Sequence, residues 1–427
     1  MSLTELAKII LRNAEVLDEH IRAHSLPVPS TASRGHSPMI QFGTQASTAA
    51  AQASMLGAIH KLNHLVQGPA APWLGTMNGA AGDAMTTAAV IHFDIVDHVP
   101  VDEEAAFEAV ARKCGMDLRD FKLISRYAMT NFIFREPRPN YIAHTAASLC
   151  LRENRVVRAL AAMSKDELYP TLASEIDAMA NYPGSQEPSE SAWAIANGAS
   201  LPLFEELAVH HPSRATTMAH AMESLASMLP DSITTDHFDW ESLDSALIVD
   251  VGGGKGFACR ALALRFPKLR LIVQDLEATA KAGREQCPAE LQERITFTTH
   301  DFFSAQPVSA DVYYFRAIMH DWPDKYCIQI LKALVSALRP GSRVVIQDPH
   351  TPDPCTVGWW QERQTRASNL RMKAFFNSHD REKHEWEGLF RQADERYRVK
   401  GVDVFLREPS NEFGPLMSSV EAVWEGE

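Results

Sequence analysis

The stretch "ALIVDVGGGKGF", residues 246–257, carries the strongest fold signal in the chain. Its apolar run ends in Asp250 and is short enough for a buried parallel strand, and four glycines then fall within five positions. The overlapping segment "KGFACRALALRF" has a helical pattern. Because glycine tolerates backbone conformations that other residues avoid, a turn of this kind can leave free N–H groups for a ligand. We therefore predict a strand, a ligand-binding turn and a helix.

Strand-like and helical segments alternate from this point to the C-terminus. Four further strands are predicted at "LRLIVQD", "RITFTTHD", "ADVYYF" and "SRVVIQD", with helices such as "CIQILKALVSAL" between some of them. Two closing strands are predicted at "YRVKGVDVF" and "SSVEAVWE". Strands that alternate with helices in this way are typical of a doubly wound α/β sheet. We assign this sheet to a C-terminal domain, residues 236–427.

The N-terminal part has a different pattern, which is mostly helical. Residues 2–24 form an amphipathic pattern in which Ser2 and Glu5 have the spacing of a capping box. A Pro- and Ser-rich connector, residues 26–38, separates this helix from an Ala-rich helical run at about 44–66. We expect residues 1–92 to serve as a dimerisation segment or a lid. Packing against a second subunit and packing back on the same chain both remain open.

Residues 93–145 predict a helix, a turn at Cys114-Gly115, a second helix and a short hairpin. This is the winged-helix pattern, which many DNA-binding proteins use. The second helix, however, carries Asp117 and Asp120 among its basic residues, and the chain has a net charge of −13. Binding to a phosphate backbone requires an excess of Lys and Arg. We therefore assign residues 93–235 to packing, dimerisation and substrate binding, and keep a winged-helix regulator as a distant alternative.

The composition limits the partners of the protein. Hydrophobic residues make up 45% and charged residues 22% of the 427 residues, as in ordinary soluble proteins. The six cysteines are scattered without C-x-x-C pairs, so neither a zinc site nor a disulfide framework is predicted. There is no signal-peptide pattern at the N-terminus and no apolar run of bilayer length. We expect a cytoplasmic protein that binds no metal, no nucleic acid and no membrane.

Two other glycine-rich ligand loops fit the sequence poorly. The dinucleotide fingerprint G-x-G-x-x-G/A needs a small last residue, but counting from Gly252 or Gly254 places Phe257 or Cys259 there. A P-loop lysine must follow Gly-x4-Gly and precede Ser or Thr, and Lys255 does neither. Both loops are therefore disfavoured.

The pattern acid-x-Gly-x-Gly-x-Gly resembles motif I of the S-adenosylmethionine-dependent methyltransferases. That family places a ribose-binding acid at the end of the second strand, where Asp275 lies, and an acid and an aromatic residue after the third strand, where "THDFF" supplies Asp301 and Phe302. The resemblance implies a Rossmann-like fold with S-adenosylmethionine as cofactor. The cofactor contacts that it implies are Asp250, Gly252, Gly254, Gly256, Asp275, Asp301, Phe302 and Arg316.

The segment "FRAIMHDWPDKYCIQILKAL", residues 315–334, resembles the HDW segment of O-methyltransferases that act on phenols and other small hydroxylated metabolites. In that family the histidine is the general base, which implies this role for His320. Two later acids orient that histidine. They correspond to Asp348, at the end of "VVIQD", and to Asp380 in "DREKHEW", where the family usually has Glu.

The resemblance also suggests residues around the ligands. "SRATTMAHAM" is similar to the helix that lays methionines over the methyl donor, which makes Met218 and Met222 candidates for substrate contact. Arg316, Asp321 and Trp322 are expected to shape the cofactor pocket. Further candidates for substrate contact are Trp322, Asn369 and Met372. The resemblance covers residues 90–427 and is greatest to the fungal branch, which implies an aromatic or polyketide-like substrate and a homodimer.

The chemistry of methyl transfer to a phenol agrees with these residue types. A phenol has a pKa of about 10, and a neutral imidazole, whose ordinary pKa is ~6.5, can accept its proton. The methyl donor is a sulfonium, so no metal is required. The same fold includes members that direct pericyclic or dehydration steps without methyl transfer, and these often lack the HDW base. His320 therefore favours methyl transfer and leaves such a reaction as the alternative.

Overall fold

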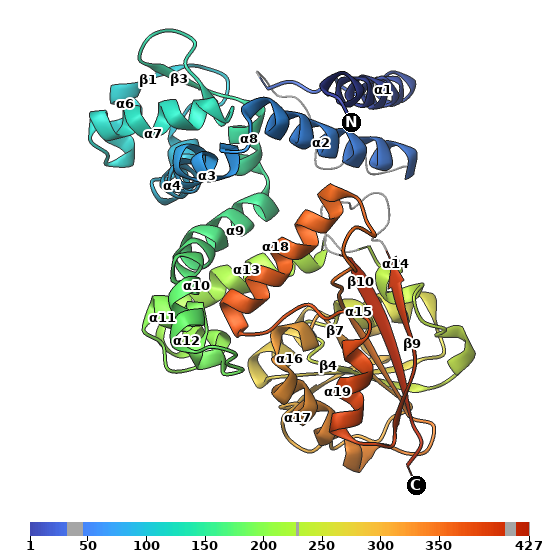
Figure 1. The fold of residues 1–427 in the computed structure, drawn as a ribbon. Helices are drawn as coiled ribbons and strands as arrows, with labels where there is room; N and C mark the ends of the chain where they lie inside the picture. The colour runs from blue at the N-terminus through green and yellow to red at the C-terminus, as the bar shows by residue number, and fades with distance from the viewer. Residues whose placement is uncertain (32–45, 228–229, 406–415, 427) are drawn as a thin grey trace. The chain divides into compact units, whose positions relative to one another are not determined.

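The computed structural model describes residues 1–31, 46–227, 230–405 and 416–426 (Figure 1). They form two compact units. The first comprises Met1–Ala173 and Glu206–Leu225, and the second comprises the described parts of Ser174–Glu205, Ala226–Glu408 and Glu412–Glu427. Helices α10 (Tyr169–Asn181) and α12 (Leu203–His210) have residues in both units.

The first unit is mainly helical. Its elements are α1 Leu3–Ala23, α2 Ala46–Gln67, α3 Ala71–Gly75, η1 Thr76–Ala80, α4 Ala81–His92, α5 Ile95–His98, β1 Ala105–Ala106, α6 Phe107–Cys114, α7 Leu118–Thr130, β2 Phe134–Arg135, β3 Tyr141–His144, α8 Ala146–Glu153, α9 Arg155–Met163, η2 Ser164–Leu168 and all but the last two residues of α13 Pro212–Ser227.

The predicted N-terminal helix is confirmed as α1, together with its capping box between Ser2 and Glu5. Leu17 and Ile21 of α1 pack against Ala51 of α2, so the apolar stripe of α1 is buried at least in part on its own chain. The predicted connector lies partly outside the described residues.

The predicted helix–turn–helix and hairpin are present as α6, α7 and the pair β2–β3, and β1 completes a three-stranded sheet with the order β1-β3-β2. The acids of the second helix have local roles. Asp117 is the N-cap of α7 and accepts hydrogen bonds from two backbone N–H groups. The guanidinium of Arg126 is paired with Glu136 at 2.8 Å. One basic side chain of this helix is thus already neutralised within the module.

The second unit contains the α/β sheet, which confirms the predicted fold class. Its elements are η3 Pro188–Glu190, α11 Ala192–Asn197, α14 Ser232–Thr235, η4 Glu241–Leu243, β4 Leu247–Val251, α15 Phe257–Arg265, β5 Arg270–Asp275, α16 Glu277–Glu285, η5 Ala289–Leu291, β6 Ile295–Thr299, β7 Val312–Arg316, η6 Met319–Asp321, α17 Asp324–Leu334, η7 Val335–Ala337, β8 Arg343–Pro349, α18 Trp359–Phe376, α19 Glu385–Ala393, β9 Tyr397–Phe405 and β10 Met417–Trp424.

The seven strands have the order β6-β5-β4-β7-β8-β10-β9. The pairs from β6 to β8 are parallel, whereas β10 runs antiparallel between β8 and β9. The strand order reverses at β4, because β5 lies on one side of it and β7 on the other. In open sheets of this kind, ligands bind at the carboxyl ends of the strands beside the reversal. The glycine turn after β4 lies at this edge.

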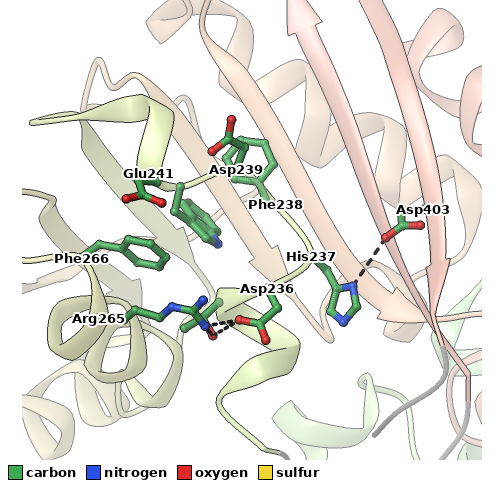
Figure 2. A pocket seen from close by; sticks show the side chains of 10 residues that line it. Asp236, His237, Phe238, Asp239, Glu241, Arg265, Phe266 and Asp403 are labelled. Atoms are coloured by element: carbon green, nitrogen blue, oxygen red, sulfur yellow. Dashed lines mark hydrogen bonds and ion pairs between the residues drawn. The ribbon is translucent and has the colours of Figure 1, made fainter.

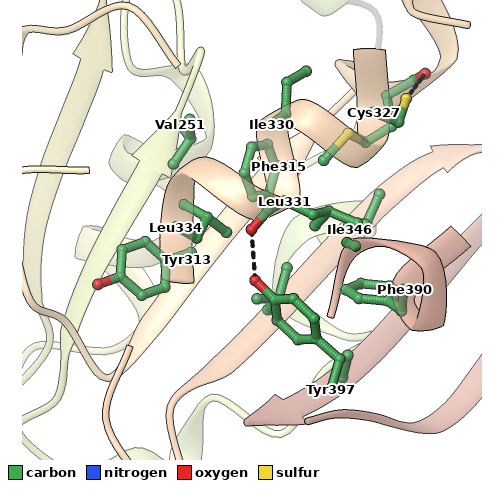
Figure 3. Close-up of a cluster of buried hydrophobic side chains, with 14 of the residues drawn as sticks. Val251, Tyr313, Phe315, Cys327, Ile330, Leu331, Leu334, Ile346, Phe390 and Tyr397 are labelled. Carbon is green, nitrogen blue, oxygen red and sulfur yellow. Dashed lines mark hydrogen bonds between the residues drawn. The ribbon is translucent and has the colours of Figure 1, made fainter. Parts of the chain in front are cut away.

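Buried side chains cover both faces of the sheet. On one face, Ile330 and Leu331 of α17 and Phe390 of α19 pack against Phe315 and Ile346 of the central strands (Figure 3). On the other face, α15 supplies a second cluster around β4, β5 and β7. The layers therefore hold β4, β7 and β8 in fixed register, and the residues at their carboxyl ends are brought together.

Candidate active site

The glycine turn between β4 and α15 has a conformation that requires glycine. Gly252, Gly254 and Gly256 have φ angles of +70°, +58° and +78°, in the left-handed region. Space is restricted as well, because a Cβ on Gly252 would lie 2.7 Å from Ile318 Cδ1. A Cβ on Gly254 would meet no atom within 4 Å. The space beside the middle of the turn is therefore open to a ligand.

The N–H groups of this turn are already engaged. Those of Gly252 and Gly253 donate to the carbonyl oxygen of Gln274 at 2.8 and 3.1 Å, and that of Gly254 donates to Asp275 Oδ2 at 2.9 Å. The expectation that the turn offers free N–H groups is wrong for these three residues. The turn instead provides an open backbone surface that is fixed to the end of β5.

Asp250 lies under the turn and is buried. A Cβ on Gly253 would lie 2.4 Å from its Oδ2, so glycine at this position lets the carboxylate tuck beneath the backbone. Burial raises the pKa of Asp250 to about 6, although the positive charge of Arg316 lowers it. Arg316 also donates to Thr234 Oγ1 at 3.4 Å. These contacts indicate that Asp250 supports the turn from below.

The carboxylate of Asp275 ends β5 beside the turn. It accepts hydrogen bonds from Gly254 N–H and, at 2.8 Å, from Leu276 N–H, so its orientation is fixed. The ring of Phe302 lies beside the glycine turn, 3.6 Å from the position that a Cβ on Gly252 would take. Asp301 is exposed and accepts a hydrogen bond from the N–H of Phe303 at 3.0 Å. An acid, an aromatic ring and the glycine turn thus surround the open space.

His320 lies on η6, in the turn that follows β7. Its Nδ1 is 3.3 Å from Asp380 Oδ1, and its Nε2 is 3.6 Å from Asp321 Oδ1, beyond hydrogen-bond distance. The Asp380 side chain is fully buried, whereas that of His320 is 15% exposed. An Nδ1–H that donates to Asp380 would leave Nε2 free to accept a proton.

Asp348 acts on the same turn by a different route. Its Oδ1 accepts a hydrogen bond from the N–H of Ile318 at 3.1 Å, so it contacts the backbone two residues before His320. Ala317, between this residue and β7, has a φ of +54°, which is strained for a residue with a Cβ. Its N–H donates to the carbonyl of Gln347 at 2.9 Å. Two consecutive residues of β8 thus hold the strained turn that carries His320.

The cluster around His320 contains three carboxylates and one imidazole, so its negative and positive charges do not balance. Burial by itself lowers the pKa of His320, but the carboxylates of Asp321, Asp380 and Asp348 outweigh it and raise that pKa to about 10. Burial raises the pKa of Asp321 to about 6, although His320 lowers it. Within the described residues, Asp348 Oδ2 and Asp380 Oδ2 are buried and make no hydrogen bond. The cluster therefore has unused capacity to hold protons.

The backbone of Asp380 is clamped by a side chain from α18. Asn369 Oδ1 accepts from the N–H of Asp380 at 3.1 Å, and its Nδ2 donates to the carbonyl of Asp380 at 3.3 Å and to Thr351 Oγ1 at 2.9 Å. Thr351 Oγ1 donates to the same carbonyl at 2.6 Å. The amide of Asn369, predicted as a candidate for substrate contact, is thus engaged in holding the carboxylate that faces His320.

Arg381, the next residue along the chain, is buried and fully used. Its guanidinium donates to Asp324 Oδ1 at 3.0 and 2.7 Å, to the carbonyls of Met319 and Trp322 at 2.8 and 2.9 Å, and to Cys327 Sγ at 3.3 Å. It therefore joins the segment around Asp380 to both ends of the HDW turn. The sequence analysis gave no role to Thr351, or to Arg381 within "DREKHEW", because their partners lie far away along the chain.

The predicted substrate-contact residues other than Asn369 are Trp322, Met372, Met218 and Met222. Trp322 belongs to an aromatic cluster in which its ring lies edge-on to Phe302 at 6.0 Å and to Phe303 at 4.8 Å. Met372 lies on α18 and is partly buried. Met218 is buried and Met222 largely exposed on α13, in the first unit. Their substrate roles stay predictions.

A separate hollow of about 460 Å³ lies at the surface of the second unit (Figure 2). Arg265 is paired there with Asp236, and His237 Nδ1 lies 3.5 Å from Asp403. No candidate cofactor or catalytic residue lines it.

The described residues also contain no group of three His, Cys, Asp or Glu side chains placed to hold a metal, and no helix among them is long and apolar enough to cross a membrane.

Comparison with known proteins identifies the family. The model of the O-methyltransferase domain matches residues 179–395. O-methyltransferase kk1A of Curvularia clavata is 33% identical, covering 99% of this chain and 97% of the relative. The grayanic acid biosynthesis cluster O-methyltransferase of Cladonia grayi is 34% identical, covering 100% of this chain and 88% of the relative. The chain belongs to the S-adenosylmethionine-dependent O-methyltransferases.

Solved structures agree on the fold of this methyltransferase. OxaC has a TM-score of 0.78 at 18% identity, covering 99% of this chain and 98% of OxaC. LepI, solved in complex with S-adenosylmethionine, has a TM-score of 0.69 at 20% identity, covering 88% of this chain and 94% of LepI. At these identities the likeness shows the fold alone. The full-length fungal relatives show that the enzyme transfers a methyl group to an oxygen of a metabolite.

Proposed function

We propose that this enzyme methylates a phenolic hydroxyl group of an aromatic or polyketide-like secondary metabolite, with His320 as the general base. The observation that carries the proposal is the 3.3 Å contact between His320 Nδ1 and the buried carboxylate of Asp380, with Nε2 outside hydrogen-bond distance of Asp321. A relative named for a grayanic acid biosynthesis cluster supports a secondary metabolite as substrate.

The edge of the sheet fits the cofactor of the family. When bound, S-adenosylmethionine supplies a methyl group on a sulfonium. Asp275 presents a fixed carboxylate that suits two ribose hydroxyls, and the ring of Phe302 offers an apolar surface for adenine. The net negative charge of the nearby Asp cluster favours a cationic cofactor. The glycines leave the open surface along which this cofactor would lie.

His320 acts in its neutral form. Nε2 accepts the proton of the substrate hydroxyl as the oxygen becomes a nucleophile, a contribution of roughly 10²–10⁴-fold. Asp380 keeps the other ring proton on Nδ1 and stabilises the imidazolium that forms. Asp348 holds the backbone at Ile318, so it fixes where the ring stands. The protein therefore supplies a base, its support and a fixed turn.

The proposal is tested with a panel of hydroxylated aromatic acceptors incubated with S-adenosylmethionine and analysed by mass spectrometry. We expect a mass gain of one methyl group in the product and no requirement for added metal. The alternative of a pericyclic or dehydrating enzyme requires conversion without methyl transfer. Full conversion of a substrate in the presence of S-adenosylhomocysteine alone would exclude the methyl-transfer proposal.

We further propose that the first unit mediates homodimerisation. Exposed apolar side chains occur along its N-terminal helices, including Trp73 at 81% and Val66 at 67% exposure. A second copy that covers this surface would remove it from water. Light scattering should report twice the chain mass of 47.4 kDa, and a monomer at micromolar concentration would contradict the proposal.

A further inference from the structure

Arg371, on α18, is the exception among the partly or fully buried arginines that the structure describes. Its side chain is partly buried, yet within the described residues its guanidinium makes no hydrogen bond and no ion pair. The other partly or fully buried arginines of the described residues each have at least one such partner: Arg152, Arg158, Arg214, Arg260, Arg294, Arg316, Arg343, Arg366 and Arg381.

Arg371 lies close to the catalytic cluster. Asn369, two residues earlier on α18, is hydrogen-bonded to both backbone groups of Asp380. Burial lowers the pKa of Arg371, and the carboxylate of Asp380 lies near enough to offset part of this shift. Asp380 in turn contacts His320. Arg371 and His320 thus both interact with Asp380, Arg371 through charge alone and His320 in direct contact.

The guanidinium of Arg371 is only partly desolvated. None of its nitrogens is among the buried atoms that lack a hydrogen bond, so its N–H donors reach solvent and are available to an anion. Arg381, the residue after Asp380, shows how the fold stabilises a buried guanidinium, since it makes five contacts. Arg371 makes no such contact with the residues that the structure describes, so it joins none of their elements. Its planar fork is suited to two oxygens of a carboxylate.

We propose that Arg371 binds a carboxylate of the methyl acceptor, so that the enzyme selects hydroxylated carboxylic acids over their neutral esters. The inference rests on the proposed function, because it places the acid and the accepting hydroxyl on one molecule between Arg371 and His320. The carboxylate anchors the substrate, and the hydroxyl is thereby directed to Nε2 of the base. Arg371 is a specificity residue in this arrangement.

The test measures binding and does not depend on turnover. Wild-type enzyme saturated with S-adenosylhomocysteine is titrated calorimetrically with a set of hydroxylated benzoic and naphthoic acids, each paired with its methyl ester. We expect at least one acid to bind about 10- to 100-fold more tightly than its ester, as for a charge-assisted hydrogen bond. Arg371→Gln should abolish this preference and Arg371→Lys should retain part of it.

Arg363→Gln is the matched control. Arg363 lies two turns earlier on α18, is exposed and lies 5.7 Å from the ring centre of Trp359. This variant should keep the full preference for the acid. Circular dichroism should show that Arg371→Gln is folded, because this guanidinium makes no hydrogen bond to any residue in the described part of the chain.

Three outcomes would overturn the inference. One is that no acid in the set binds wild-type enzyme better than its ester. Another is that the preference survives in Arg371→Gln. The last is that Arg371→Gln weakens S-adenosylhomocysteine binding and leaves the preference intact, which would assign the guanidinium to the cofactor carboxylate. An acid preference that depends on Arg371, without methyl transfer to any acceptor, would instead refute the proposed function, and Arg371 would then bind the carboxylate of a ligand that is not methylated.

Discussion

The glycine turn and the His320 cluster lie at the same edge of one sheet but differ in how far their polar groups are satisfied. At the turn, the N–H groups of Gly252, Gly253 and Gly254 are all bonded to β5 or the residue that ends it. In the cluster, one carboxylate oxygen of Asp348 and one of Asp380, Oδ2 in each case, are buried and make no hydrogen bond within the described residues. The backbone of the first region is bonded without a ligand, although Asp250 Oδ1 beneath it makes no hydrogen bond within the described residues, whereas the second region has carboxylate oxygens without partners beside the base.

This difference separates binding from chemistry. A satisfied backbone keeps its shape whether or not a ligand is present, so the cofactor region is preorganised by its own hydrogen bonds. A cluster with three carboxylates and one imidazole can gain, lose or share a proton at small structural cost. We therefore expect substitutions in the cluster to change rates and pH dependence, and substitutions at the turn to change cofactor affinity.

His320→Ala should produce the largest effect. Removal of the base should lower kcat by about two to four orders of magnitude. Binding of S-adenosylmethionine, measured by calorimetry, should stay within about twofold of wild type, because His320 makes no hydrogen bond to the glycine turn. Loss of cofactor binding together with turnover would show that the two regions are not separable.

Arg381→Met and Arg371→Met test the structural side of the same comparison. Arg381→Met removes a donor from Asp324 and from two carbonyls. Because the Asp324 side chain is 42% exposed and water can replace part of this contact, the free energy of unfolding should fall by about 1–3 kcal/mol. Arg371→Met removes a guanidinium that has no hydrogen-bond partner among the described residues, and it should change the unfolding free energy by less than about 0.5 kcal/mol or raise it. Chemical denaturation of both variants gives these values. Equal destabilisation would contradict the difference between the two arginines.

Asp275→Ala should weaken cofactor binding by about 10- to 100-fold, equivalent to ~1–3 kcal/mol, because both ribose acceptors are lost and Gly254 N–H loses its partner. Glu277→Ala, an exposed acid in the first turn of α16, is the matched control and should bind normally. At saturating cofactor, kcat of Asp275→Ala should be near that of wild type. A large loss of kcat with unchanged affinity would place Asp275 in the chemistry.

Much of the fold could be predicted because its signals are local. The limits of β9 agree with the predicted stretch "YRVKGVDVF", and the Ser2–Glu5 capping box marks the start of α1. The same holds for the glycine turn, since Gly252 and Gly256 have positive φ angles that the spacing suggested. These features depend on neighbouring residues and on backbone sterics, and they can therefore be predicted from the sequence alone.

The contacts of the site could be predicted only in part. Resemblance supplied His320, Asp348 and Asp380, but it did not show that Asp348 bonds to the backbone of Ile318 while Asp380 faces the imidazole. The clamp by Asn369 joins α18 to a loop 11 residues later, and the missing partner of Arg371 is a property of packing. No periodicity or spacing encodes such tertiary contacts, so only the structure shows them.

The smallest expected effect, and the one that tests the cluster most directly, is a shift in pH dependence. In the free enzyme His320 is a base only after it loses its proton, and the surrounding carboxylates raise its pKa to about 10. The value of kcat/KM should therefore rise with pH through the alkaline range, since it reports the free enzyme. Because the folded pKa lies above the ordinary value of ~6.5, the ion pairs stabilise the fold fully below that pH, and this stability is lost as pH rises through about 10.

Asp380→Asn should move this rise to lower pH by about one pH unit or more, because one of the carboxylates that favour the imidazolium is gone. Its plateau rate should fall at the same time, by less than in His320→Ala, because the amide supports the imidazolium less well than a carboxylate does. Glu395→Gln, an exposed acid before β9, should leave the profile unchanged. The two effects of Asp380→Asn have opposite consequences near neutral pH, so full profiles of kcat/KM are needed. A profile that stays in place, or moves to higher pH, would mean that the titrating group is not His320, and the cluster would then be a support for binding and not the site of proton transfer.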